Sequence, residues 1–278
     1  MSESGLLQYV LLNGTFFKNK EKLFTAGIFE KFLFKEQIRS AHCHLLFWEE
    51  QIEQINRQLK LFHIKESSVT QKKSKDIKRQ IERILTKNKL FKEALVTVYF
   101  FKNGTDAEYL IKTETLNIEN EFNSEKGAFL SFNPYNIKNI SAFSSFASGS
   151  EIFWEFAVMN THSPFEPLLQ NQEGIILEVP GKNLFIIKKN KVYTPNIAAG
   201  AFRSPAFPLV RAICTELEMD FIQDQKISCN DMTDAEEIFL VSHIYGIMRV
   251  TGFENKRYFL NKTRQIAHLF QEKILSFT

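Results

Sequence analysis

The stretch GIILEVPGKNLFIIKKNKVYTP, from Gly174 to Pro195, carries the most information about the fold of this chain. Its apolar runs predict two strands, Gly174–Glu178 and Asn183–Lys188. Glu178 stands at the end of the first strand. A carboxylate in that position is either a functional acid or a plain strand-end charge, and the stretch fixes a register against which the other candidate residues are checked.

Working outward, hydrophobic periodicity and turn residues predict a chain of mixed α and β structure. The dipeptide Asn13-Gly14 predicts a hairpin between strands 9–12 and 15–17. Further strands are expected at 23–26, 32–38, 94–101, 109–115, 128–132, 166–170, 221–227, 238–243 and 246–250. Helices are expected at 45–62, 70–87, 150–160, 205–219 and 263–275, with a short helical turn at 230–236.

A polar, acidic stretch at 117–126 is the candidate linker between two domains. It divides the chain into a smaller N-terminal α+β domain, 1–117, and a larger C-terminal α+β domain, 126–278. A chain of 278 residues with 44% hydrophobic residues is long enough for two modest domains.

Composition restricts the function classes. The net charge of +3 is too small to predict binding to nucleic acid or a membrane. The three cysteines have no metal-ligand spacing, and His42 and His44 are not accompanied by a carboxylate motif, so no metal site is expected. The N-terminus has no basic segment followed by an apolar run, and a cytoplasmic protein is expected.

The predicted helix 70–87 is strongly basic, with Lys72, Lys73, Lys75, Lys78, Arg79, Arg83 and Lys87. A solvated helix face is the simpler interpretation of this charge. An anionic partner is the alternative.

In order and spacing, several segments together resemble the fold-type IV pyridoxal-phosphate (PLP) enzymes, which include class IV aminotransferases and 4-amino-4-deoxychorismate lyase. The stretch 174–195 is similar to the core motif of that family. Lys35–Arg39 is similar to its "FETIR" strand, His44 and the following helix to its "HxxRL" element, and Asp234–Gly246 to its "ADEvFlt…gI" segment. The resemblance implies a two-domain α+β fold with a cleft between the domains, and a homodimer.

PLP chemistry needs a lysine amine for the Schiff base and an acid at the pyridine nitrogen. By resemblance, Glu178 is that acid. Counting back from it without gaps puts the family lysine at Ser145, whose hydroxyl cannot form an imine. Lys138 could substitute only if the chain were re-threaded by about seven residues, roughly 20 Å of extended strand.

The family's phosphate-binding positions are also substituted. Phe47 stands where the family has arginine. The phosphate turn aligns with Ser204, Pro205 and Ala206, and Pro205 has no N–H to donate. The last phosphate contact falls at Val241 and Ser242.

Two hypotheses follow from these substitutions. In the first, which we favour from sequence, the protein has lost PLP chemistry, carries no cofactor and is a pseudoenzyme or binding protein, with a small-molecule ligand possible in the cleft. In the second, it is an active PLP-dependent aminotransferase or aminodeoxychorismate lyase that uses a non-standard lysine such as Lys138.

Overall fold

The computed structural model describes residues 9–18, 30–64, 71–118, 127–138, 145–146 and 165–276. The chain divides into two compact units, Met1–Ile118 with the last two residues, and Glu119–Ser276. The predicted strand 23–26, the predicted helix 150–160 and most of the predicted linker lie outside the described residues.

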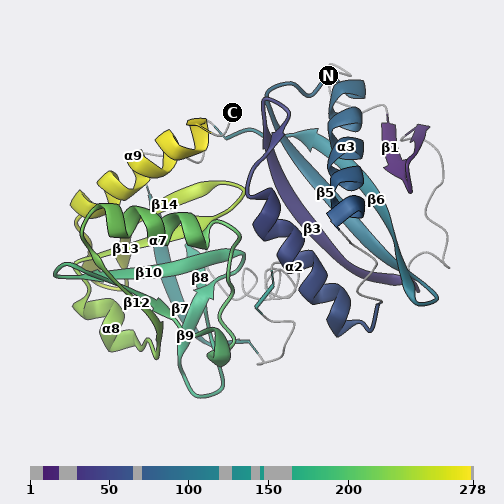
Figure 1. The fold of residues 1–278 in the computed structure, drawn as a ribbon. Helices are drawn as coiled ribbons and strands as arrows, with labels where there is room; N and C mark the ends of the chain where they lie inside the picture. Colours follow the sequence, from purple (N-terminus) through teal and green to yellow (C-terminus); the bar gives the residue numbers. More distant parts are fainter. Residues whose placement is uncertain are drawn as a thin grey trace, which may run out of the picture. The chain divides into compact units, whose positions relative to one another are not determined.

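Unit 1 is an antiparallel sheet covered by two helices (Figure 1). Its strands are β1 (Tyr9–Leu12), β2 (Thr15–Lys18), β3 (Phe32–Ala41), β4 (His44–Leu45), β5 (Glu93–Asn103) and β6 (Asp106–Thr115), in the order β2-β1-β6-β5-β3-β4. The Asn13-Gly14 hairpin is confirmed, with φ of 45° at Asn13 and 86° at Gly14, the left-handed conformations that such a turn requires.

The two helices of unit 1 are α2 (Trp48–Leu61) and α3 (Gln71–Lys87). Helix α2 packs on β3, and α3 packs on β1 and β6. The predicted start of α2 at residue 45 is three residues early, because Leu45 belongs to β4 and Phe47 takes a left-handed φ of 54° before the helix begins. Phenylalanine rings fill the interface, with Phe34 stacked on Phe100 at 4.8 Å between centroids.

Unit 2 contains a nine-stranded mixed sheet in its described residues. Its strands are β7 (Ala128–Ile137), β8 (Glu166–Gln170), β9 (Ile176–Val179), β10 (Lys182–Lys188), β11 (Lys191–Pro195), β12 (Asp220–Gln225), β13 (Glu237–Ser242), β14 (Gly246–Phe253) and β15 (Lys256–Arg257). The order is β12-β11-β10-β13-β14-β7-β8-β9, with β15 on β14. Because β9 also pairs with β10, six of these strands close into a ring around an apolar core.

Three α-helices of unit 2 are described: α7 (Phe207–Glu216), α8 (Cys229–Asp234) and α9 (Asn261–Ser276). Helix α7 packs on β12 and α9, and α9 packs on β13 and β14. The buried carboxylate of Glu237 accepts hydrogen bonds from the backbone N–H groups of Asn261, Lys262 and Thr263, and so caps the first turn of α9. Strand β11 was not predicted, because its short run is bounded by Lys191 and Pro195.

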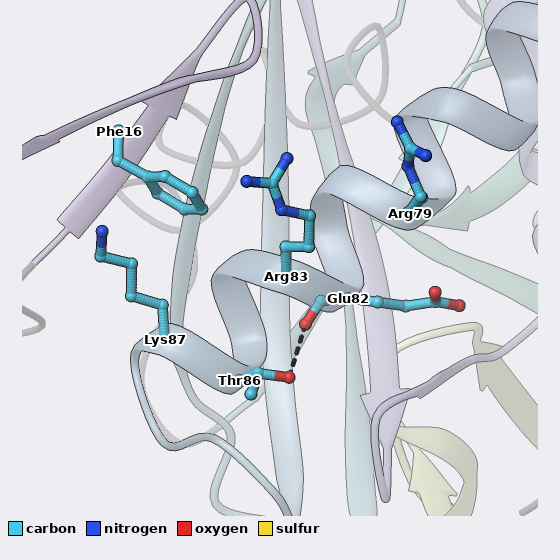
Figure 2. Close-up of a pocket in the computed structure, with 6 residues that line it drawn as sticks. All are labelled: Phe16, Arg79, Glu82, Arg83, Thr86 and Lys87. Atoms are coloured by element: carbon cyan, nitrogen blue, oxygen red, sulfur yellow. Dashed lines mark hydrogen bonds between the residues drawn. The ribbon is translucent and has the colours of Figure 1, made fainter.

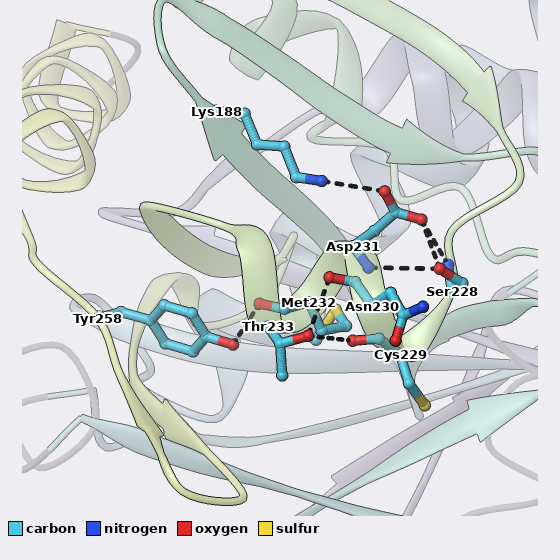
Figure 3. A network of polar contacts seen from close by, with 8 residues as sticks. All are labelled: Lys188, Ser228, Cys229, Asn230, Asp231, Met232, Thr233 and Tyr258. Atoms are coloured by element: carbon cyan, nitrogen blue, oxygen red, sulfur yellow. Dashed lines mark hydrogen bonds and ion pairs between the residues drawn. The ribbon is translucent and has the colours of Figure 1, made fainter.

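The short helix α8 is held by a polar network (Figure 3). Ser228 and Asp231 form a capping box: the Ser228 hydroxyl accepts from the Asp231 N–H, and Asp231 Oδ2 accepts from the Ser228 N–H at 3.0 Å. Lys188 donates to Asp231 Oδ1 at 3.0 Å, and the Tyr258 hydroxyl donates to the Met232 carbonyl at 2.7 Å. Burial would raise the pKa of Asp231, but the hydrogen bonds from Ser228 and Lys188 outweigh it and hold that pKa below its ordinary value.

We expect Asp231→Asn to lower the free energy of unfolding by about 1 kcal/mol at pH 7, the usual value of a cap. The folded-state pKa of Asp231 is depressed, so this stabilisation is present above the unfolded pKa and is lost as the pH falls through the folded pKa. Urea unfolding across acidic pH measures the difference. Asp234→Asn, an exposed acid on the same helix, is the control; an equal effect of the two variants would contradict the prediction.

Candidate active site

Glu178 lies in β9 in the middle of a row of neighbouring strands. The turn Pro180-Gly181, with φ of 71° at Gly181, joins β9 to β10 and sets Glu178 opposite Asn183. Asn183 is in turn opposite Val241 of β13. The side chain of Glu178 is fully buried. A buried carboxylate needs partners, and this one has both a cation and a backbone donor.

The cation is Lys138, at the residue directly after β7. Its Nζ lies 2.8 Å from Glu178 Oε1, and neither side chain is exposed to solvent. The Lys138 N–H donates to the carbonyl of Gln170 at 2.7 Å, which continues the parallel pairing of β7 with β8 and fixes where the side chain enters the core. Burial lowers the pKa of the Lys138 amine, and the neighbouring Glu178 carboxylate only partly opposes this.

The backbone donor comes from the loop before α7. The N–H of Phe202 donates to Glu178 Oε2. Asn183 holds this loop at two points, because its Nδ2 donates to the Phe202 carbonyl and its Oδ1 accepts from the Ser204 N–H at 2.9 Å. Asn183 therefore positions the donor that Glu178 uses.

Asn136 is a second polar group on the same stretch of β7. It is fully buried, and neither its Nδ2 nor its Oδ1 has a hydrogen-bond partner among the described residues. Residues i and i+2 of a strand share a face, so Asn136 lies on the side of β7 that Lys138 continues. A buried amide without partners costs about 1–3 kcal/mol, and the usual explanation is a polar molecule or ion bound beside it.

The residues at the family's phosphate positions occupy two segments of unit 2. Ser204, Pro205 and Ala206 are buried at the start of α7, and Ala206 donates its N–H to Ser204 Oγ at 3.1 Å. Val241 and Ser242 end β13, where Ser242 Oγ accepts from the N–H groups of Ile244 and Tyr245. Both serine oxygens thus accept from the backbone, which leaves each hydroxyl hydrogen to donate to an anion.

The other predicted positions lie as follows. Phe47, in unit 1, is half-buried, and its carbonyl accepts from the Gln51 N–H at 2.9 Å. The Ser145 carbonyl accepts from the Arg203 N–H at 3.1 Å. The structure therefore sets Lys138, and not Ser145, against Glu178. Ser145 stands seven positions after Lys138, and the gap-free count misses those residues because they lie between Lys138 and β8.

His42 and Cys43 have φ of 50° and 67° and form the turn between β3 and β4, instead of the strand or helix considered from sequence. Within the described ranges, no three histidine, cysteine, aspartate or glutamate side chains gather as metal ligands. No helix in those ranges combines the length and apolarity needed to span a bilayer.

Comparison with known proteins identifies the class. Residues 27–253 match the family model for amino-transferase class IV. The chain therefore belongs to the class IV aminotransferase family, and its fold is that of the fold-type IV enzymes, as the sequence resemblance implied.

Two solved structures share the fold across almost the whole chain. The branched-chain aminotransferase of Thermoproteus uzoniensis, solved with norvaline, has a TM-score of 0.82 at 15% identity, covering 97% of this chain and 95% of its own. A branched-chain amino acid aminotransferase of T.th., complexed with N-(5'-phosphopyridoxyl)-L-glutamate, has a TM-score of 0.79 at 13% identity, covering 98% and 95%.

A probable branched-chain-amino-acid aminotransferase of Aquifex aeolicus is 28% identical over 96 residues, which is 33% of this chain and 30% of the relative. These findings contradict the sequence-based expectation that the protein has no cofactor. The family consists of PLP-dependent aminotransferases, and one structural neighbour is complexed with a phosphopyridoxyl compound.

Sequence reasoning did not assign roles to Asn136 and Asn183. A signal for Asn183 was present, because it is a polar residue five positions after Glu178 at the start of an apolar strand. For Asn136 the signal was its i, i+2 relation to Lys138, which was not used because the gap-free count pointed to Ser145.

We expect Lys138→Met and Glu178→Gln each to lower the free energy of unfolding by about 3–5 kcal/mol, because each leaves a buried partner uncompensated. The double variant should lose much less than the sum, since both charges are removed together. Urea unfolding at pH 7 without added ligand completes the cycle.

The control cycle uses Lys182 and Glu166, a pair at 3.0 Å whose side chains are 12% and 20% exposed. We expect a coupling of about 1 kcal/mol or less there. Additive losses at Lys138 and Glu178 would show that the two side chains do not depend on each other.

Proposed function

We propose that the protein is a PLP-dependent aminotransferase in which Lys138 carries the cofactor. One observation supports this most: Lys138 and Glu178 are fully buried against each other at 2.8 Å. Desolvating two charges costs several kcal/mol, so such a pair is a weak source of stability and a better indication of function. A lysine amine and a carboxylate are also the two groups that PLP chemistry requires of a protein.

The residues around the pair fit the cofactor. Lys138 supplies an amine for the aldehyde, and Glu178 supplies an anion for the ring nitrogen. Asn136 offers an amide without a partner among the described residues, which favours a polar molecule beside Lys138. The hydroxyls of Ser204 and Ser242 stand at the phosphate positions implied by the resemblance, and each keeps a hydrogen to donate.

PLP, when bound, supplies a ring that withdraws electrons from the substrate carbon next to the nitrogen. The protein's own contribution is at three atoms. The Lys138 amine, with its pKa lowered by burial, is more readily neutral and can accept and return a proton at Nζ. Glu178 holds negative charge where the ring nitrogen must stay protonated. The Phe202 N–H, positioned by Asn183, keeps the carboxylate oriented.

The same reasoning changes the weight of the substituted phosphate positions. Phe47 in place of arginine and Pro205 in place of an N–H donor remove contacts, but neither removes the amine or the acid. The proposal therefore predicts an enzyme with a weakened grip on the phosphate, not one without cofactor chemistry. The homodimer, the ligand cleft between the domains and the cytoplasmic location expected from sequence stay predictions.

Covalent labelling tests the assignment of Lys138. We expect the purified chain with PLP to absorb in the near-visible range, and borohydride reduction to fix the label on the peptide that contains Lys138, as peptide mass spectrometry would detect. Lys138→Met should lose the label, whereas Lys182→Met should keep it. Label only on surface lysines, or none at all, would rule the proposal out.

Amino transfer is measured separately, with L-glutamate and a panel of 2-oxo acids as partners. Formation of 2-oxoglutarate by the wild-type chain, and its loss of at least a thousandfold in Lys138→Met, is the expected result, because general acid–base and covalent catalysis each contribute large factors. A labelled protein that eliminates instead of transferring would keep the cofactor assignment and replace the reaction with a lyase.

Asn136→Leu separates ligand binding from stability. Leucine has a similar volume and no polar atoms, so we expect the unfolding free energy without PLP to rise by about 1–3 kcal/mol and the affinity for PLP to fall. Thermal unfolding with and without PLP measures both. The matched control is Asn171→Leu, because the buried Asn171 amide bonds Glu173, Ile175 and Ala199 and its loss should destabilise. A destabilised Asn136→Leu would contradict a ligand-facing role.

A further inference from the structure

Helix α3 of unit 1 carries charge that the proposed reaction does not use. Its 17 residues contain seven lysines and arginines against Asp76 and Glu82, a formal +5, whereas the whole chain carries +3. The remainder of the chain is therefore slightly acidic. Positive charge that is concentrated on one helix creates a local attraction for anions that the net charge of the protein conceals.

Strand β2 and helix α3 form a hollow of about 400 Å³ on this surface, open to solvent (Figure 2). It is lined by Phe16, Arg79, Glu82, Arg83, Thr86 and Lys87. The volume lies in the range of small-molecule sites. Arg79, Arg83 and Lys87 follow one another at four-residue intervals, so they share one face of the helix with a rise of about 6 Å between neighbours.

Two of the three cations are held by aromatic rings and not by carboxylates. The Nζ of Lys87 lies 4.1 Å from the centroid of Phe16 and 4.2 Å from that of Tyr9, and the Cζ of Arg83 lies 5.4 Å from the centroid of Phe16. In the described part of the chain, Arg83 and Lys87 have no carboxylate within 4.0 Å, whereas Arg79 pairs with Asp76 at 3.1 Å. Contact with a ring face stabilises a cation but uses few of its N–H donors.

The acid of the pocket does not neutralise these cations. Figure 2 shows the Glu82 side chain directed away from the group formed by Phe16, Arg83 and Lys87. The Thr86 hydroxyl donates to the Glu82 carbonyl at 2.9 Å. The heads of Arg83 and Lys87 thus converge on one ring with their hydrogen-bond donors unused by any acid, which is the arrangement that recognises a multiply charged anion.

We propose that this hollow, the β2–α3 pocket, binds a small ligand that carries a polyphosphate group, with Arg83 and Lys87 as its contacts and Arg79 at its edge. A polyphosphate supplies several oxygens and more than one negative charge to adjacent cations, which a single carboxylate does not. The hollow is local and the net charge of the chain is small, so a long nucleic acid is the less favoured occupant.

Isothermal titration of the full chain with inorganic tripolyphosphate tests the proposal. We expect saturable binding that weakens when salt is raised from about 50 to 300 mM, because the contacts are solvent-exposed ion pairs. The double variant Arg83→Ala/Lys87→Ala should weaken binding at least tenfold. The matched control Lys75→Ala/Lys78→Ala removes the same charge from the same helix outside the pocket, and should change affinity less than twofold.

Each other outcome overturns the site. No heat beyond dilution with the wild-type chain, or equal losses in the two double variants, would leave only a diffuse basic surface. Tighter binding of a labelled single-stranded RNA, lost with the same two residues, would replace the polyphosphate with nucleic acid. Circular dichroism confirms that each variant is folded. Labelling of Lys138 by PLP reports a separate site in unit 2, so failure here and failure of the proposed function are distinguishable.

Discussion

The buried ion pair between Lys138 and Glu178 imposes the conditions that the surrounding structure satisfies. An amine and a carboxylate removed from water must each be matched by geometry and by further hydrogen bonds, or the protein loses stability. Here the match is made between β7 and β9, two strands that are far apart in sequence and that β8 brings together. The polar centre of unit 2 is thus built by the sheet.

The support extends outward from Glu178 through the backbone. Asn183, opposite Glu178 on β10, holds the loop that donates the Phe202 N–H to the carboxylate. The same loop leads directly into α7, so the start of that helix and the position of the acid are fixed by one side chain. Asn136 adds a polar group that has no partner in the described residues, which is the feature of this region that favours a bound ligand most directly.

Much of the fold could be predicted from sequence, and the reasons are local. Asn13-Gly14 determines its hairpin, and the apolar stripe Ile77, Ile81, Ile84 and Leu85 determines α3, because turn chemistry and period depend on neighbouring residues. The resemblance also led correctly to the family. The partner of Glu178 could not be predicted in the same way. A residue count assumes a fixed length for the chain between two strands, whereas the contact depends on which strands pair and in what register.

That difference explains why Lys138 was the less favoured candidate from sequence. The path from Lys138 to β8 can lengthen without moving either end, because both ends are fixed in a parallel pair of strands. The parts of the site that depend on side-chain identity, such as Pro205 and Phe47, were visible in the sequence, but their energetic weight was not. Without the position of the amine, lost phosphate contacts were taken as a lost cofactor.

Closure of the strand ring has a consequence for how long Glu178 keeps its position. Strand β9 is hydrogen-bonded to β8 on one side and to β10 on the other, so it has no free edge from which to peel away. Local fraying, which loosens many short strands, would here have to open the whole ring. The acid is therefore retained for the lifetime of the folded unit, and the slowest amide hydrogens of the domain should include those of this short strand.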